Sequence, residues 1–105
     1  MSIIFCGDFV LPYHVNVDYA EVVPLFKDCK AIANFEGSLL KEETETSLYR
    51  WKDKFSLYSC PAVLGILKDL HVEAVSLCNN HILDYQHDIE DTVETLRQNG
   101  VKSWG

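Results

Sequence analysis

Three short, almost continuously apolar runs are the clearest pattern in the chain, and each predicts a buried strand. The first covers Ser2–Cys6 and ends at Gly7 and Asp8, the second covers Lys30–Phe35, and the third covers Val72–Cys78. Short runs of this kind are typical of parallel sheets, in which helices cover both faces of each strand. We therefore expect the first run to be a central strand that is buried on both faces.

Helical periodicity follows two of these runs. After Pro61, apolar residues recur three and four positions apart, which is typical of one helix face. The last helix is predicted from a similar stripe, with Asp88 as its cap and Asn99 and Gly100 as its stop. Val101–Trp104 is the possible start of a fourth strand. The two stripes are Val63, Ile66, Leu67 and Leu70, and then Ile89, Val93 and Leu96.

Two other segments are less regular. Asp18 and Glu21 resemble a capping box, but Pro24 requires the helix that follows to begin late or to bend. Ser38–Lys54 has the composition of a long loop, and its charged part, Lys41–Glu45, is best interpreted as solvated. Aromatic residues near this loop either line a substrate cleft or hold the loop against the domain; they are Tyr49, Trp51 and Phe55.

The order of these elements predicts the fold class. Strands and helices alternate along the chain, which indicates an α/β fold with a mostly parallel sheet and right-handed crossovers. A length of 105 residues, 48% of them hydrophobic, is consistent with one globular unit. The chain contains neither a G-x-G-x-x-G motif nor a P-loop, so those routes to nucleotide binding have no support.

Charge and cysteine content limit the possible partners and the cellular compartment of the chain. A formal net charge of −7 without a basic run argues against nucleic-acid binding. No apolar run is long enough to span a membrane, and no signal peptide precedes the first strand. We therefore expect a cytoplasmic chain with reduced thiols, in which Cys6 and Cys78 are small core residues.

Polar side chains follow each predicted strand. Asp8, Glu36 and Asn80 come after the first, second and third strands, and the carboxyl ends of parallel strands share one edge of a sheet. Together with His81 they provide the donors of a site for a hard or borderline divalent cation. Such a site activates water and neutralises a phosphate-like transition state. Asp84 either orients His81 or caps the following turn.

Each of these motifs also has a simpler interpretation. The Gly7 and Asp8 pair, the Glu36 and Gly37 pair and the polar triplet at 79–81 are all common in turns after strands. What favours a site is their occurrence at three successive strand ends. We assign no role to the remaining histidines, which are His14, His71 and His87.

Three motifs resemble the N-terminal part of the CapA, or poly-γ-glutamate capsule biosynthesis, family, whose domain is similar to the calcineurin-like metallophosphoesterases. The first two motifs are I-I-F-C-G-D-F at the start and A-N-F-E-G-S-L at 33–39. The third and most specific is V-S-L-C-N-N-H-I-L-D-Y at 75–85. The resemblance covers essentially the whole chain. The family domain is more than twice as long, and its later Gly-His-x-His-like motif is not in this chain.

The resemblance implies a role for each of these residues. Asp8, Glu36 and Asn80 are expected to bind a divalent metal ion, either Mn, Mg, Ca, Fe or Zn. His81 is expected to act as the acid, with Asp84 holding its ring in orientation. Other possible site residues are Asn34, which either binds metal or holds the loop, and Asn79.

The resemblance also has consequences for the whole chain. Residues 1–105 are expected to be the first half of a metallophosphoesterase-like domain, inactive by itself and self-associating through an exposed sheet edge or helix faces. The parent is expected to be a metal-dependent hydrolase of a phosphoester or polymer substrate. The alternative is a non-catalytic binding or assembly component of capsule or envelope polymer synthesis.

Overall fold

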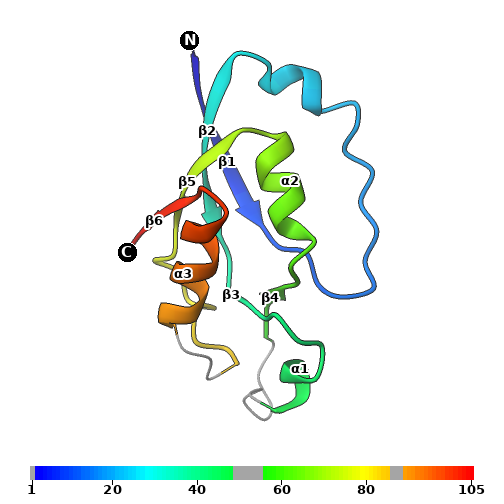
Figure 1. Ribbon diagram of the computed structural model, residues 1–105, viewed down its shortest axis with the longest axis vertical. Coiled ribbons are helices and arrows are strands. Elements are labelled where there is room, and N and C mark those ends of the chain that lie inside the picture. The colour runs from blue at the N-terminus through cyan, green and yellow to red at the C-terminus, as the bar shows by residue number, and fades with distance from the viewer. Residues whose placement is uncertain (1, 49–55, 86–88) are drawn as a thin grey trace.

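Four parallel strands form the main sheet of the computed structural model, which describes residues 2–48, 56–85 and 89–105 (Figure 1). Their order across the sheet is β1-β2-β5-β6, and every neighbouring pair is parallel. The predicted α/β class is confirmed, and so is the fourth strand. In sheet order, the strands span Ser2–Phe9, Cys29–Phe35, Val72–Ser76 and Lys102–Trp104.

The helices follow the predicted apolar stripes. Helix α2 (Val63–Asp69) buries Val63 and Leu67, and α3 (Ile89–Gln98) buries Leu96. The segment around Pro24 forms a short 3-10 helix, η1 (Val23–Phe26), with the proline in its first turn. A proline is tolerated there because the first N–H groups of a helix have no intrahelical partner.

A second, two-stranded sheet lies beyond the carboxyl end of the main sheet. Its strands β3 (Ser38–Leu39) and β4 (Tyr58–Ser59) are parallel, and the short helix α1 (Glu45–Leu48) lies between them in the chain. The backbone N–H of Leu39 donates to Thr92 Oγ1 of α3 at 3.1 Å, which ties the small sheet to this helix. The loop aromatics considered above, Tyr49, Trp51 and Phe55, lie outside the described residues.

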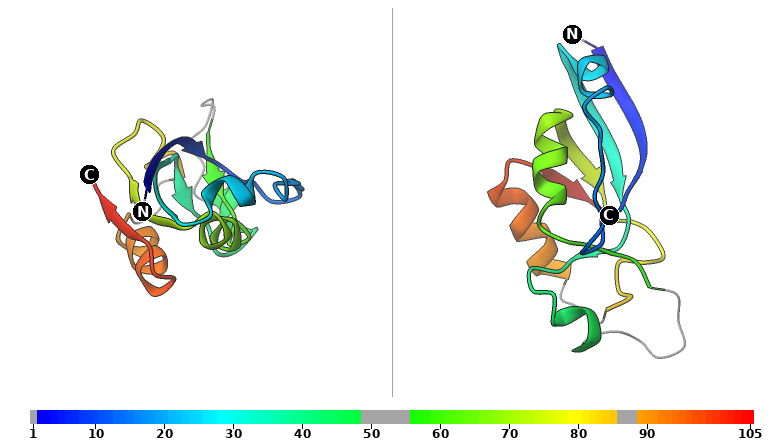
Figure 2. Two further views of the ribbon diagram at one scale, coloured as in Figure 1. Left: turned by 90° about the horizontal axis from the view of Figure 1, so that it is seen from above. Right: turned by 90° about the vertical axis from the view of Figure 1, so that its right-hand side faces the viewer.

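Helices α2 and α3 lie on the same side of the main sheet (Figure 2). The strand order explains this, because each new strand is added in the same direction and right-handed crossovers then place every connection on one face. Within the described part of the chain, no helix covers the opposite face. We refer to this opposite side as the open face.

The prediction that the first strand is central and buried on both faces is wrong. Strand β1 is at the edge of the sheet and pairs only with β2 among the described strands. Its residues Ile3 and Phe5 are 59% and 79% exposed on the open face, whereas Ile4 and Cys6 pack against the core. A continuously apolar run does not reveal whether both faces are covered, because coverage depends on the strand order.

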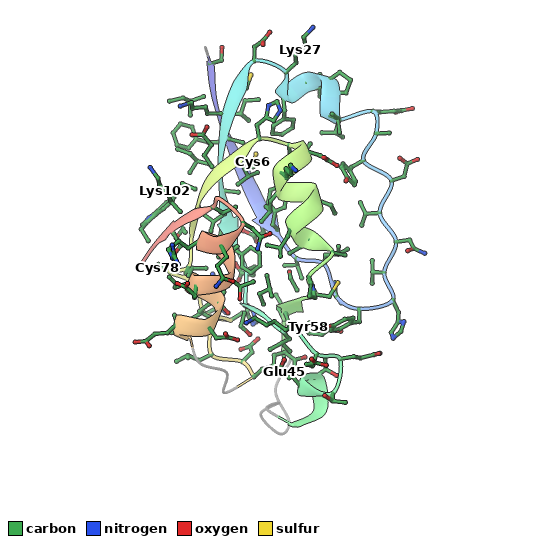
Figure 3. All side chains as sticks on the ribbon, in the orientation of Figure 1. Cys6, Lys27, Glu45, Tyr58, Cys78 and Lys102 are labelled. Carbon is green, nitrogen blue, oxygen red and sulfur yellow. The ribbon has the colours of Figure 1, made fainter. Side chains whose placement is uncertain are left out.

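The cysteines also differ in part from expectation. Cys6 is half-buried against the core, and burial raises the pKa of its thiol. Cys78 was predicted to be a core residue, but it is exposed because β5 ends at Ser76 and Cys78 lies in the following turn (Figure 3). Cys60 is the buried cysteine instead, and Cys29 is half-buried.

Candidate functional site

The carboxyl ends of β1 and β2 bring two acidic side chains onto one amide group. Asn34 Nδ2 donates a hydrogen bond to Asp8 Oδ1 at 2.8 Å and another to Glu36 Oε2. Asp8 is exposed, while Glu36 is only 8% exposed. Both hydrogens of the Asn34 amide therefore hold two carboxylates, Asp8 and Glu36, that are 28 positions apart in the chain.

A bulge in β1 places Asp8 beside Asn34. Phe5 pairs with Ile32, but the next pair is Asp8 with Asn34, so β1 contains one residue more than β2 in this stretch. Side chains alternate between the faces of a strand, and one extra residue transfers all that follow to the other face. Without the bulge, Asp8 would lie on the helix-covered face, away from Asn34.

Asn79 connects the turn after β5 to the turn after β2. Its Nδ2 donates to the Phe35 carbonyl oxygen at 2.7 Å and to Asn34 Oδ1 at 3.3 Å. Its Oδ1 accepts from the backbone N–H groups of Gly37 at 3.3 Å and His81 at 3.1 Å. The side chain thus uses both ends of its amide to join the acidic pair to the segment that carries the histidine.

His81 contacts a fully buried carboxylate. Its Nδ1 lies 2.5 Å from Asp84 Oδ2, and the same oxygen accepts from the backbone N–H of Leu57 at 2.8 Å. The side chain of Asp84 is 0% exposed and that of His81 is 17% exposed. A buried carboxylate on Nδ1 orients an imidazole and selects its tautomer, so the geometry suits a histidine that transfers protons through Nε2.

Asn80 stands apart from this network. Its side chain is exposed, and no hydrogen bond joins it to another residue in the described ranges. The structure therefore brings together Asp8, Asn34, Glu36, Asn79 and, through its backbone N–H, His81, and it leaves the neighbouring asparagine outside.

Comparison with known proteins identifies the family. A family model described as bacterial capsule synthesis protein PGA_cap matches residues 2–105. The chain belongs to this family. The match confirms the resemblance to capsule biosynthesis proteins inferred from the three motifs. No curated protein and no solved structure matched the chain. Among the described residues, no helix has the length and apolar character needed to cross a membrane.

The donors of this PGA_cap family member fit a divalent cation in chemistry but are few in number. The oxygens of the two carboxylates that Asn34 holds together suit a hard cation such as Mg²⁺, Mn²⁺ or Ca²⁺. However, residues 2–48, 56–85 and 89–105 contain no group of three or more His, Cys, Asp or Glu side chains placed to hold a metal. A cation bound here would take its remaining ligands from amide oxygens, water or substrate.

A row of tyrosines, which the sequence reasoning did not single out, ends at Tyr85, the residue after Asp84. The rings of Tyr58 and Tyr85 meet edge to face with centroids 5.3 Å apart, and Tyr13 lies 5.9 Å from Tyr58 on the other side. Burial is the main cause that raises the pKa of Tyr13, whose hydroxyl donates to the Leu40 carbonyl oxygen. The only sequence signal was the position of Tyr85 directly after Asp84.

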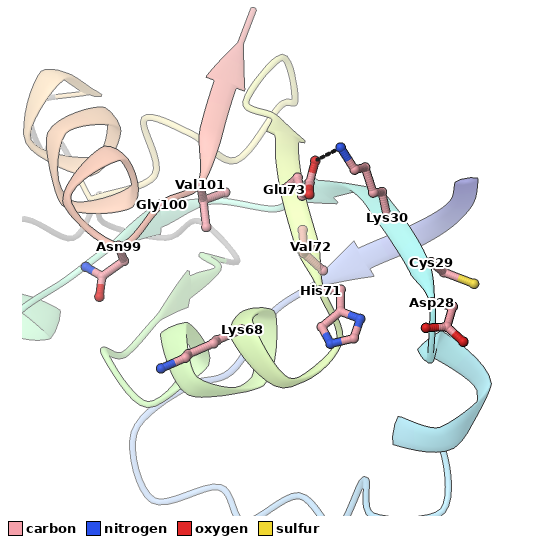
Figure 4. A pocket seen from close by; sticks show the side chains of 10 residues that line it. All are labelled: Asp28, Cys29, Lys30, Lys68, His71, Val72, Glu73, Asn99, Gly100 and Val101. Atoms are coloured by element: carbon pink, nitrogen blue, oxygen red, sulfur yellow. Dashed lines mark ion pairs between the residues drawn. The ribbon is translucent and has the colours of Figure 1, made fainter. Parts of the chain in front are cut away.

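The candidate site does not coincide with the cavity shown in Figure 4. This cavity of about 430 Å³ lies at the amino-terminal ends of the strands, opposite the candidate site, where the chain enters β2, β5 and β6. The turns there pass through left-handed residues, which are Asp28, His71 and Gly100, and an exposed ion pair joins Lys30 to Glu73. None of the candidate residues lines this cavity.

Proposed function

We propose that this capsule synthesis family member belongs to a metal-dependent hydrolase that cleaves a phosphoester or related bond in capsule or envelope polymer metabolism, such as that of poly-γ-glutamate. Asp8 and Glu36 would hold a divalent cation, with Asn80 as a further ligand. The cation would polarise the substrate and activate water. His81 would protonate the leaving group, held in orientation by Asp84.

The joining of two functional pairs at one sheet edge supports this proposal. Asn34 links Asp8 to Glu36, and Asn79 links Asn34 to the backbone of His81. An anionic pair linked through Asn79 to the segment that carries a histidine on a buried carboxylate has the groups that acid catalysis beside a cation requires. Simple turns after strands would not need side-chain contacts between residues 34 and 79.

Hydrolysis of a chromogenic phosphodiester by the intact protein with Mn²⁺ tests the proposal. We expect His81→Ala to lower turnover at least about 100-fold, because it removes the proton donor. The matched control is His14→Ala, since His14 is an exposed histidine that pairs with Glu43 away from Asp84. Equal turnover in His81→Ala and the wild-type protein would contradict the mechanism, as would no hydrolysis by the wild-type protein.

A second function, a non-catalytic binding or assembly role in polymer synthesis, is favoured by one observation. The described residues hold Asp8 and Glu36 on Asn34 without a third acidic, histidine or cysteine ligand. In this case the same edge would bind polymer without cleaving it. Retention of labelled capsule polymer by the wild-type protein, with no loss of polymer length, would favour this role over hydrolysis. A cytoplasmic location is part of either proposal.

A further inference from the structure

Three backbone groups determine the orientation of the Asn79 amide. The Phe35 carbonyl requires a donor, which Nδ2 provides, while the N–H groups of Gly37 and His81 require an acceptor, which Oδ1 provides. Rotating the amide by half a turn would place donor against donor and acceptor against acceptor at all three contacts. The Asn79 amide therefore has one favourable orientation.

This orientation determines that of Asn34. Asn79 Nδ2 faces Asn34 Oδ1 at 3.3 Å, so Asn34 must present its oxygen to Asn79 and its Nδ2 to Asp8 and Glu36. The acidic side agrees, because ionised carboxylates only accept hydrogen bonds. Asn34 is thus constrained from both sides to offer the carboxylates a donor.

A hydrogen-bond donor in this position competes with a cation for the same carboxylate oxygens. Carboxylate oxygens lie about 2.0–2.6 Å from Mg²⁺ or Ca²⁺, and Asn34 Nδ2 is 2.8 Å from Asp8 Oδ1. A cation that binds Asp8 Oδ1 and Glu36 Oε2 would therefore occupy the space of the amide nitrogen, whose hydrogens carry partial positive charge. The amide cannot turn its oxygen to the cation without breaking its contact with Asn79.

We propose that Asn34 is an internal competitor of the cation and not one of its ligands. Its amide holds Asp8 and Glu36 together when no cation is bound, and it leaves both carboxylates when a cation binds. Asn79 maintains this state through its backbone contacts. The inference rests on the proposed function, because it concerns the same cation site. It predicts that removing the Asn34 amide strengthens cation binding, whereas a ligand role predicts that the same change weakens it.

Calorimetric titration of the 105-residue chain with Mn²⁺ tests the direction of this change in affinity. We expect Asn34→Ala to bind Mn²⁺ about tenfold more tightly than the wild-type chain, because the competing hydrogen bonds to charged groups are gone. The double variant Asp8→Asn, Glu36→Gln serves as the control that removes the site. Equal or weaker binding by Asn34→Ala, with wild-type binding intact, would overturn the competitor role alone. Absence of binding in every variant would overturn the cation site as well.

A measurement on the wild-type chain covers the case in which Asn34→Ala does not fold. We expect the side-chain NH₂ resonances of Asn34 to shift on titration with Mg²⁺, since both of their acceptors are lost. Asn99 is the internal control, because its amide donates to the Thr95 carbonyl in α3. Unchanged Asn34 NH₂ resonances under Mg²⁺ concentrations that shift the Asp8 and Glu36 carboxyl signals would overturn the proposal.

Discussion

Two adjacent asparagines illustrate how differently the fold uses the same side chain. Asn79 is half-buried and its side chain makes four hydrogen bonds, three of them to backbone groups. Asn80 is exposed and makes none to another described residue. The sequence favoured Asn80 as a ligand because it follows the third predicted strand and because the family resemblance implies that role, which stays a prediction. The structure instead makes Asn79 the residue that connects the site.

This difference predicts unequal effects on stability. We expect Asn79→Ala to lower the free energy of unfolding by about 1–3 kcal/mol, because buried backbone donors lose their partner. Asn80→Ala is the matched control and should change it by less than about 0.5 kcal/mol, as is usual for exposed positions. Urea unfolding followed by circular dichroism measures both, and similar losses in the two variants would contradict the connecting role of Asn79.

At the scale of elements, two glycines end a strand and a helix in the left-handed region. Gly37 follows β2 with φ of +80°, and Gly100 follows α3 with φ of +79°. A Cβ at Gly37 would lie 2.4 Å from the Leu57 carbonyl oxygen, whereas a Cβ at Gly100 would meet nothing within 4 Å. Gly100 was predicted as a helix stop from its local sequence, but the close approach of Leu57 to Gly37 is a tertiary feature.

A series of glycine-to-alanine variants separates these two effects. We expect Gly100→Ala to cost about 1 kcal/mol of unfolding free energy for its left-handed backbone alone. Gly37→Ala should cost at least about 2 kcal/mol, since the clash with Leu57 adds to the same backbone penalty. Gly65→Ala, inside α2 with open space around it, should stabilise by about 0.5–1 kcal/mol. Thermal unfolding ranks the three, and a smaller loss for Gly37→Ala than for Gly100→Ala would contradict the clash.

For the whole molecule, the main consequence of the strand order is the open face. It exposes Ile3 and Phe5 of the edge strand β1 and Trp104 of the opposite edge strand β6. An edge strand with apolar residues and an uncovered sheet face is a common surface for association. Self-association, which the sequence predicts, is therefore best tested on this face.

We expect the sedimentation coefficient of the 105-residue chain to rise with concentration. Phe5→Lys should reduce that rise, because a charge on the open face must be desolvated when the face is covered. Leu25→Lys is the matched control, since Leu25 is 71% exposed but belongs to η1. A chain that sediments as a monomer at high concentration, or equal effects of the two variants, would contradict association through the open face.

Much of this protein was determined by local sequence. The short apolar runs and the helical period of three to four, together with Pro24 and Gly100, predicted the strands, the helices and the parallel α/β order, because these patterns reflect interactions between residues close in the chain. The positions of Glu36 and His81 after successive strands also followed from that order, whereas Asp8, expected after the first strand, lies inside β1 near its end.

Only the tertiary structure decided which faces and which partners these residues have. It placed β1 at the edge, and it inserted the bulge that turns Asp8 toward Asn34. It also paired Asn34 with Asn79, whose positions differ by 45 residues. Strand order, bulges and amide orientation depend on contacts between distant segments, and the periodicity of a single segment contains no information about its partners.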